Sequence, residues 1–340
     1  MHQSQTVANS MLLSTPSPRK LWVDVLRGLC MVLILFDHSE LYYAQTNIVP
    51  YALYVPDALI CFFFLSGYLF CKGGVCSFRG KLNSILQHLL LPYFLFSLLM
   101  AMPKALAHGK SLAVLDLLLP ILMGNASWFI PALIVGELLF LLLLRMANEK
   151  PLVLYALAML CFFGAPWLQD APISLPWQLP NALQAVGFMA LGDAFRRYEA
   201  TVLRFLTPWR TASLVLLLIL VKVYIGIAQP HIMIAPIRIG SYPAFLLTVL
   251  SVPFLAVRLL QLLPSSQCLA WIGRHTLALC FLSGGVPLLV SAVFRRMGYA
   301  YNGNYLLVVC LFFLVLLLAC AAAAFIHRFL PFLLRKGYGK

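Results

Sequence analysis

The chain has 340 residues, of which 63% are hydrophobic and only 10% are charged, and its formal net charge is +14. Soluble domains carry about 25% charged residues, so this composition excludes a soluble globular protein. The basic residues lie in short loops between apolar runs rather than in one patch, which argues against nucleic-acid binding.

Residues 1–20 are polar and rich in Ser, Thr and Pro, and we interpret them as a flexible cytoplasmic tail. They do not resemble a signal peptide, because the apolar run that follows carries Asp24, Arg27, Asp37 and His38. The loops between later apolar runs are too short to fold alone. Residues 21–335 are therefore predicted to form a single transmembrane domain.

Ten apolar runs in this domain approach the roughly 20 residues that a membrane-spanning helix needs. They cover residues 22–43, 52–71, 83–103, 127–146, 151–168, 180–197, 211–228, 242–262, 268–293 and 304–330. A further apolar stretch, residues 112–123, is too short to span and is expected to be re-entrant or interfacial. The predicted fold class is an all-α polytopic membrane protein with about ten transmembrane helices.

The distribution of basic residues predicts that the N- and C-termini are both cytoplasmic. With that orientation the far side of the membrane receives only Lys104, Lys110, Arg238, Arg295 and Arg296 from the loops and helix ends. Cytoplasmic loops of membrane proteins carry the excess of Lys and Arg. An even number of helices is required, and ten satisfies this condition.

The first predicted helix contains most of the ionisable groups. Arg27 and His38 are eleven residues apart, which is three helical turns plus about 20°, so they share one face about 16 Å apart along the axis. Asp24 lies one turn before Arg27 and is placed to pair with it. Asp37 points away from this stripe. We expect Arg27 near the cytoplasmic surface and His38 well within the membrane.

Two interpretations of this stripe are open from spacing alone. An imidazole can deprotonate a hydroxyl or carry an acyl group near neutral pH, and an Arg at the cytoplasmic side suits the phosphates of a large anionic donor. Alternatively, Arg27 extends to the interface beside Asp24 while His38 is a packing histidine. The nine cysteines lie mostly in apolar runs without metal-ligand spacing, so we expect no metal.

Other polar groups in the apolar runs give weaker signals. Asp57, His88, Glu137 and Lys222 are expected either to face a water-filled cavity or simply to lie near the far and middle levels of the membrane. Trp128 is interpreted as an interfacial residue.

Two segments carry more specific information. Residues 21–39 read LWVDVLRGLCMVLILFDHS, with Asp-x-x-Arg-Gly and a His at Arg-x10-His spacing, and residues 62–68 read FFFLSGY. These segments resemble the first two helices of the acyltransferase-3 family of sugar O-acyltransferases. Weaker resemblances follow in the same order at residues 91–93, 128–133, 175–197 and 271–285. The resemblance is colinear over about residues 20–330.

The resemblance implies a multi-pass enzyme of a bacterial cytoplasmic (inner) membrane. It implies an acyl-CoA donor, usually acetyl-CoA, bound from the cytoplasm, and an acceptor hydroxyl on a sugar of a surface polysaccharide or its lipid-linked precursor. By position, His38 would be the catalytic histidine and Arg27, with Asp24, its partner near the donor. Ser66 and Gly67 would help to shape the donor path, although a small pair of this kind also favours close helix packing.

The sequence departs from the family pattern at the predicted donor site. The family often has Arg-x-x-Arg before the third-helix Pro-Tyr, whereas His88 and Ile85 occupy these positions here. Arg79 and Lys81 lie one or two turns earlier and are the basic residues that would replace them as donor contacts.

Later positions differ as well. A Tyr and a His of the family become Cys280 and Ser283, so a second catalytic or acceptor-contacting His is absent, and Asp193 is unusual after Gly192. Gly273 matches a ninth-helix position. These differences indicate a divergent branch, close to the short fucose O-acetylase-like members, with His38 as the single strong candidate base.

Two rival functions remain open from the sequence. A transporter or exporter of polysaccharide or lipid-linked sugar would also have about ten helices and buried charges, but no inverted halves with matched broken helices are visible. A family member that binds without catalysis would fit the loss of the late His. The Arg27–His38 stripe together with FFFLSGY favours the enzyme.

Overall fold

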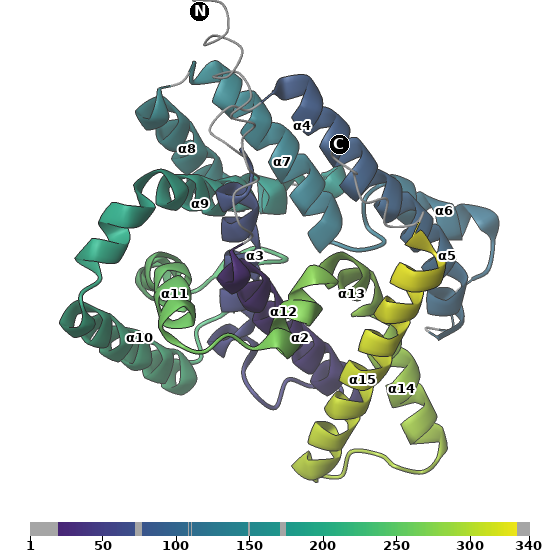
Figure 1. The fold of residues 1–340 in the computed structure, drawn as a ribbon. Helices are drawn as coiled ribbons and strands as arrows, with labels where there is room; N and C mark the ends of the chain where they lie inside the picture. Colours follow the sequence, from purple (N-terminus) through teal and green to yellow (C-terminus); the bar gives the residue numbers. More distant parts are fainter. Residues whose placement is uncertain are drawn as a thin grey trace, which may run out of the picture.

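The computed structural model describes residues 20–71, 77–107, 109, 111–148, 150–170 and 175–331. All ten predicted apolar runs are helical in the described residues (Figure 1), whereas the predicted tail lies almost wholly outside them. The helices are α2 (Leu21–Ala44), α3 (Val55–Tyr68), α4 (Phe78–Ile85), α5 (Leu91–Ala107), α6 (Val114–Leu122), α7 (Phe129–Met146), α8 (Pro151–Gln169), α9 (Leu179–Phe205), α10 (Pro208–Ala228), α11 (Tyr242–Leu262), α12 (Gln267–Arg274), α13 (Thr276–Leu282), α14 (Gly285–Arg296) and α15 (Tyr305–Phe329).

The helices form three groups around a centre made by α2 and α3. Helices α4 to α8 lie on one side, α9 to α11 on a second, and α12 to α15 on a third (Figure 1). The π-helical turn Leu86–Leu90 joins α4 to α5, and short 3-10 turns at Tyr51–Leu53 and Pro176–Gln178 precede α3 and α9. At this centre, polar side chains of α2 lie beside residues of the surrounding helices.

The described residues contain six helices that are long and apolar enough to cross a membrane, or seven if α13 and α14 form one broken span. The angle between α13 and α14 is 42°. The chain is therefore a multi-pass membrane protein. Helix α2 is not among the six because it contains several charged residues, among them Asp24, Arg27 and Asp37. Helix α3 is not among them because it has only 14 residues. The count of ten spans and the cytoplasmic termini stay predictions.

The predicted run 268–293 is not one continuous helix. It forms α12, α13 and the greater part of α14, with interruptions at His275 and at residues 283–284. The predicted interfacial stretch 112–123 contains the short helix α6, whose Leu115 and Leu119 are exposed.

Helices α2 and α12 cross at a pair of glycines. A Cβ atom at Gly28 would overlap the carbonyl oxygen of Leu269, and one at Gly273 would overlap the carbonyl oxygen of Asp24. Small residues let helix backbones approach closely in membrane bundles, where packing rather than the hydrophobic effect drives association. The glycine of the first-helix motif therefore holds the first helix against the start of the broken segment.

Helices α3 and α9 cross in the same way. A Cβ atom at Gly67 would overlap the carbonyl oxygen of Met189, and one at Gly192 would overlap the carbonyl oxygen of Phe64. The glycine of the FFFLSGY motif is thus a packing residue. Together the two crossings fix the positions of α2 and α3 relative to their neighbours.

Polar contacts join helix ends at both ends of the bundle. Lys20 precedes α2 and its Nζ atom donates to Tyr68 at the end of α3 (2.7 Å) and to Glu199 in α9 (2.7 Å to Oε2). Burial acts to lower the pKa of Lys20, but the hydrogen bonds to Glu199 and Tyr68 outweigh it and raise that pKa above the ordinary lysine value. Toward the other end, Lys222 in α10 forms a 2.7 Å ion pair with Asp57 in α3.

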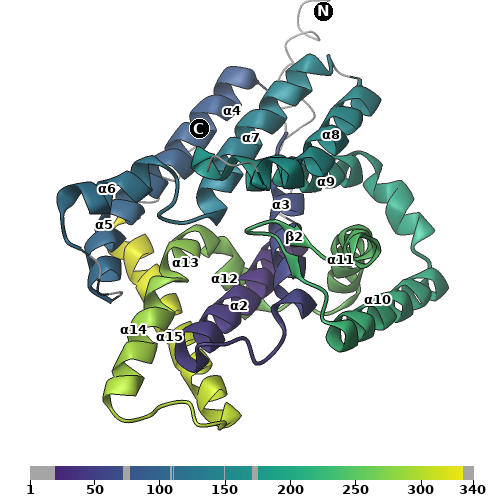
Figure 2. The same cartoon turned by 180° about the vertical axis from the view of Figure 1, so that it is seen from behind.

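A short hairpin, which the apolar pattern of the sequence does not predict, follows α10. Strands β1 (Ile232–Met233) and β2 (Arg238–Ile239) pair antiparallel (Figure 2). β1 contacts the turn Tyr51–Leu53 that precedes α3. The hairpin stays in place because Ile232, Ile234 and Ile237 are buried.

Candidate functional site

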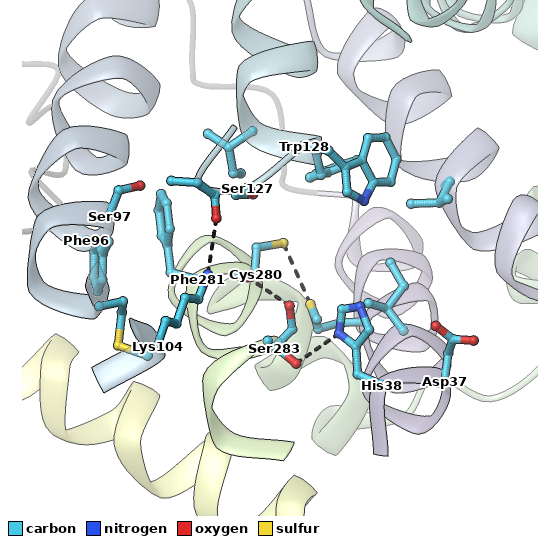
Figure 3. Close-up of a pocket in the computed structure, with 18 of the residues that line it drawn as sticks. Asp37, His38, Phe96, Ser97, Lys104, Ser127, Trp128, Cys280, Phe281 and Ser283 are labelled. Atoms are coloured by element: carbon cyan, nitrogen blue, oxygen red, sulfur yellow. Dashed lines mark hydrogen bonds between the residues drawn. The ribbon is translucent and has the colours of Figure 1, made fainter. Parts of the chain in front are cut away.

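A cavity of about 180 Å³ lies between α2, α5, the start of α7 and the break between α13 and α14 (Figure 3). Its polar and aromatic lining comes from segments that are far apart in the sequence. The polar or ring-bearing residues around it include Asp37, His38, Tyr51, Ser97, Lys104, Ser127, Trp128 and Ser283. A volume this small, below the roughly 300–1,000 Å³ of drug-sized sites, suits the reacting ends of two substrates.

His38 is held in one orientation by a backbone carbonyl. Its Nδ1 atom lies 2.9 Å from the carbonyl oxygen of Ser283. A carbonyl can only accept a hydrogen bond, so Nδ1 carries the proton and Nε2 of the neutral ring keeps its lone pair. In Figure 3 the imidazole lies between Ser283 and Trp128. The arrangement provides one basic nitrogen at a fixed place in the cavity.

The break between α13 and α14 makes this contact possible. Carbonyl groups in the last turn of a helix have no partner within the helix, and Ser283 lies just beyond the end of α13. The turn is fixed by the Ser283 hydroxyl, which donates to the carbonyl oxygen of Cys280 (2.8 Å). By the sequence resemblance, Ser283 and Cys280 correspond to a late His and Tyr of the acyltransferase-3 family, and both line the cavity.

Asp37 lines the same cavity as His38. Asp37 is about 100° away from His38 around α2, off the stripe as predicted, and the cavity extends around the helix far enough to include both residues. Asn47 donates to its Oδ1 atom at 2.8 Å. Burial and the nearby Asp37 charge raise the pKa of Tyr51, which precedes α3. Tyr51 therefore presents a neutral hydroxyl beside a carboxylate.

Lys104 is a cavity residue that the sequence analysis placed only among the few far-side cations. Its Nζ atom donates to the carbonyl oxygen of Ala126 at 3.2 Å. A second cavity of about 490 Å³ adjoins the first, and Lys104, Ser97 and Gly284 line both. In the sequence, Lys104 lies one residue beyond the predicted run 83–103, so its only signal was a basic residue at a helix end.

Trp128 also lines the His38 cavity instead of acting only as an interfacial residue. It immediately precedes α7 and makes an edge-to-face contact with Phe129, whose ring packs on Phe62 and Phe63 of α3. The opposite wall is fixed by Phe96 and Phe281, whose rings stack 4.5 Å apart and join α5 to α13. Aromatic packing thus holds the cavity walls.

Arg27 and Asp24 lie on α2 but not in the cavity wall. Met31, one turn after Arg27, and Ile34 continue the stripe to His38, and these three line the cavity. Asp24 is buried and Arg27 is partly buried, and both take part in polar interactions. The structure therefore keeps Arg27 and His38 on one face of α2 but separates them by about 16 Å along the helix.

Ser66 and Gly67 lie outside the cavity lining. Gly67 faces α9 at the helix crossing, whereas Ser66 is partly buried. Their predicted role in the donor path stays a prediction, because the described geometry accounts for Gly67 by packing alone.

The two predicted basic donor contacts differ in their surroundings. Lys81 Nζ lies 2.9 Å from Glu137 Oε2 and 4.1 Å from the centre of the Phe70 ring. Arg79, in the first turn of α4, is exposed. Lys81 is thus already neutralised by a carboxylate, and only Arg79 offers its charge to the solvent.

The remaining departures from the family pattern have structural surroundings. His88 lies in the π-helical turn and its Nδ1 atom is 2.9 Å from the carbonyl oxygen of Ser84. Asp193 is fully buried and forms ion pairs with Arg196 (2.9 Å) and Arg197 (2.7 Å), and Tyr155 also donates to it. Asp193 is therefore the counter-ion of two arginines of α9, and its hydrogen bond from Tyr155 links it to α8.

Comparison with known families supplies the identity that the geometry alone does not. Residues 20–325 match the Acyl_transf_3 family, described as an acyltransferase domain. The match covers nearly the whole chain and includes every element that borders the cavity. Neither the curated proteins nor the solved structures that were compared contain a match. Within the described residues, no group of three or more His, Cys, Asp or Glu side chains is arranged to hold a metal ion.

Proposed function

This chain belongs to the acyltransferase-3 family and is a membrane acyltransferase, and we propose that it transfers an acetyl or other short acyl group from acyl-CoA to a sugar hydroxyl. The acceptor is a surface polysaccharide or its lipid-linked precursor, and the enzyme works in the cytoplasmic membrane. The observation that carries the proposal is the single basic nitrogen of His38, fixed by Ser283 inside a small cavity.

His38 acts as the general base. Its Nε2 atom takes the proton of the acceptor hydroxyl while the hydroxyl oxygen attacks the thioester carbonyl carbon. The resulting tetrahedral intermediate breaks its C–S bond, and the imidazolium returns the proton to the leaving thiolate of CoA. The sugar ester and free CoA are the products, and His38 is neutral again.

A covalent route uses the same nitrogen. Nε2 then attacks the thioester first, CoA leaves, and the acyl group passes from the imidazole to the sugar hydroxyl. Both routes need a neutral His38 with its lone pair on Nε2. Ping-pong kinetics and a trapped acyl-histidine distinguish the covalent route from direct transfer.

The separation of Arg27 and His38 supports a long donor. The phosphates of acyl-CoA and its thioester are separated by an extended arm, so an arginine that binds the phosphates must lie well away from the acceptor hydroxyl. A distance of about 16 Å along α2 meets this requirement. Arg27 lies nearer the N-terminal end of α2, which the charge distribution predicts to be cytoplasmic.

The cavity favours a short acyl group. Its volume of about 180 Å³ must hold the carbonyl carbon, the acyl chain and the reacting part of the sugar. Trp128 and Phe129 provide flat apolar surfaces, while Asp37 and Tyr51 provide groups that hydrogen-bond to sugar hydroxyls. These features match a compact polar acceptor better than a long acyl chain.

The test uses inverted membrane vesicles that contain the protein, with isotopically labelled acetyl-CoA supplied outside. Wild-type vesicles should move label into a glycan or lipid-linked fraction, and His38→Ala should abolish the transfer at matched expression. The matched control is His231→Ala, because His231 is exposed and does not line either cavity. The proposal fails if wild-type vesicles with a broad glycan pool transfer no label and acetyl-CoA does not change the protein's thermal stability.

A further inference from the structure

Lys104 is the structural feature that the proposed acyl transfer leaves unexplained. It lies near the end of α5, and its side chain borders both the His38 cavity and the larger second cavity. Within the described residues, its ammonium group donates one hydrogen bond, to the carbonyl oxygen of Ala126. An ammonium has three N–H donors, so two remain available.

No carboxylate neutralises this ammonium within the described part of the chain. Other lysines of the bundle are paired there: Lys81 with Glu137 and Lys222 with Asp57. An unpaired cation within a span is costly and marks a functional site. Asp116 lines the second cavity but is exposed and is not within ion-pair distance of Lys104 in the described residues.

Lys104 lies on the wall of the His38 cavity that adjoins the second cavity. In Figure 3 the ammonium and Trp128 lie on opposite sides of the cavity, with Ser283 nearer the ammonium and His38 nearer Trp128. The Nζ atom would be 4.0 Å from a Cβ atom built on Gly284, which lines both cavities. Lys104 therefore faces the junction between the two cavities.

The second cavity has the character of an acceptor site. It is larger, at about 490 Å³, and lies within the size range of small-molecule sites. Ser111, Asn125 and the Tyr42 side chain give it polar groups that suit sugar hydroxyls. An acceptor in this cavity would pass Lys104 before its reacting hydroxyl reaches His38.

We propose that the acceptor carries an anionic group, and that Lys104 binds this group at the junction of the two cavities. The inference rests on the proposed acyl transfer because it assigns the anion to the acceptor. The anion is either the carboxylate of an acidic sugar or the phosphate of a lipid-linked sugar, since an ammonium binds both as a point charge. Lys104 thus selects charged acceptors over neutral ones.

The test compares sugars that differ only by an anionic group, using the purified full-length protein in detergent. Galacturonic acid is compared with galactose, and glucose 1-phosphate with glucose, by the shift in the thermal unfolding midpoint over a concentration series. At least one anionic sugar should bind about tenfold or more tightly than its neutral counterpart, as a charge-assisted hydrogen bond allows. A preference for galacturonic acid identifies an acidic sugar, and a preference for glucose 1-phosphate identifies a sugar phosphate.

Substitutions then assign the effect to Lys104. Lys104→Met should remove the difference between anionic and neutral sugars, and Lys104→Arg should keep much of it. Lys150→Met is the matched control, because Lys150 is exposed before α8 and lines neither cavity. The inference is overturned if wild-type protein binds anionic and neutral sugars equally, a result that needs no variant to fold, or if Lys104→Met and Lys104→Arg both keep the full difference.

A separate variant distinguishes this inference from the proposed function. His38→Asn should keep the preference for anionic sugars, because it leaves Lys104 in place. Absence of label transfer in wild-type vesicles, together with an anion preference of the purified wild-type protein, would reject acyl transfer while keeping the Lys104 site. Label transfer whose acceptor KM is unchanged by Lys104→Met would reject the Lys104 site alone.

Discussion

The Nδ1 atom of His38 lies 2.9 Å from the carbonyl oxygen of Ser283, so a side chain of α2 is bound to the break between α13 and α14. This contact joins α2, the first helix of the described residues, to a turn 245 residues later. It fixes both the tautomer and the direction of the imidazole. The proposed catalysis by His38 therefore depends on the local geometry of a helix break as well as on the histidine itself.

The two ring nitrogens of His38 are predicted to have separable roles. The amide nitrogen of an asparagine occupies nearly the position of Nδ1, so His38→Asn should keep the hydrogen bond to Ser283 while removing Nε2. We expect its thermal unfolding midpoint to stay near that of the wild type. Acyl transfer should fall by about 100-fold or more, because general acid–base catalysis contributes about 10²–10⁴.

The measurement pairs label transfer from acetyl-CoA with thermal unfolding of the purified variant. His38→Ala removes both nitrogens, so it should lose activity and also some stability. Substantial activity in His38→Asn would show that Nε2 is not the base and would remove His38 from the centre of the mechanism.

The glycine crossing of α2 and α12 gives a stability prediction. A Cβ atom at Gly273 would overlap the carbonyl oxygen of Asp24, so Gly273→Ala must separate the two helices. Overpacking of this kind costs about 1–3 kcal/mol or more. The free energy of unfolding in detergent, measured by denaturant titration, should fall accordingly, and acyl transfer should fall because α12 leads into the break that holds His38.

Gly164 is the matched control for this substitution. It lies within α8, and nothing would lie within 4 Å of a Cβ atom there. Gly164→Ala should be neutral or stabilise the protein by about 0.5–1 kcal/mol, because alanine favours a helix interior. Equal free energies of unfolding for Gly273→Ala and Gly164→Ala would contradict the close approach of α2 and α12 at Gly273.

The ion pair between Asp57 and Lys222 is predicted to be structural. Its atoms are 2.7 Å apart, and both side chains are largely buried between α3 and α10. Asp57→Asn would leave an unpaired lysine at that site, which should lower the free energy of unfolding by about 3 kcal/mol. Asp57→Asn combined with Lys222→Met should recover most of this loss.

Acyl transfer by the double variant decides between a structural and a functional pair. We expect transfer close to the wild-type level, since neither residue lines the His38 cavity. A stable double variant that is inactive would instead place the pair in the reaction path, as the weaker sequence interpretation allowed.

Much of this architecture could be predicted from local sequence. Each of the ten apolar runs is helical in the structure. These helices were predictable because an apolar run is recognised from adjacent residues alone. The Arg27–His38 stripe follows from the helical repeat, and the structure places His38 of this stripe in a cavity wall together with Met31 and Ile34. Family resemblance added the motif positions that became Cys280 and Ser283, which line the same cavity.

The remaining features depend on contacts between distant segments. The hydrogen bond from His38 uses a backbone carbonyl, which every residue has, so no side-chain pattern could indicate Ser283. Asp37 enters the cavity because α5, α7 and the turn before α3 enclose α2 on two faces, and the helical repeat alone could not show this. Lys104 appeared only as a basic residue near a helix end, since the second cavity arises from the packing of α5 against α6 and α14.

The two basic residues predicted to contact the donor should behave differently. Arg79 is exposed, so Arg79→Gln should raise the KM for acetyl-CoA about two- to fivefold, the range of a solvent-exposed ionic contact, and leave kcat nearly unchanged. Lys81 is bound to Glu137 at 2.9 Å, so Lys81→Gln should mainly lower stability by leaving that carboxylate without its partner. Initial rates over a range of acetyl-CoA concentrations, with thermal unfolding of both variants, separate the two effects. A larger change in KM for Lys81→Gln than for Arg79→Gln would mean that the donor displaces Glu137 from Lys81, and Lys81 rather than Arg79 would then be the phosphate contact.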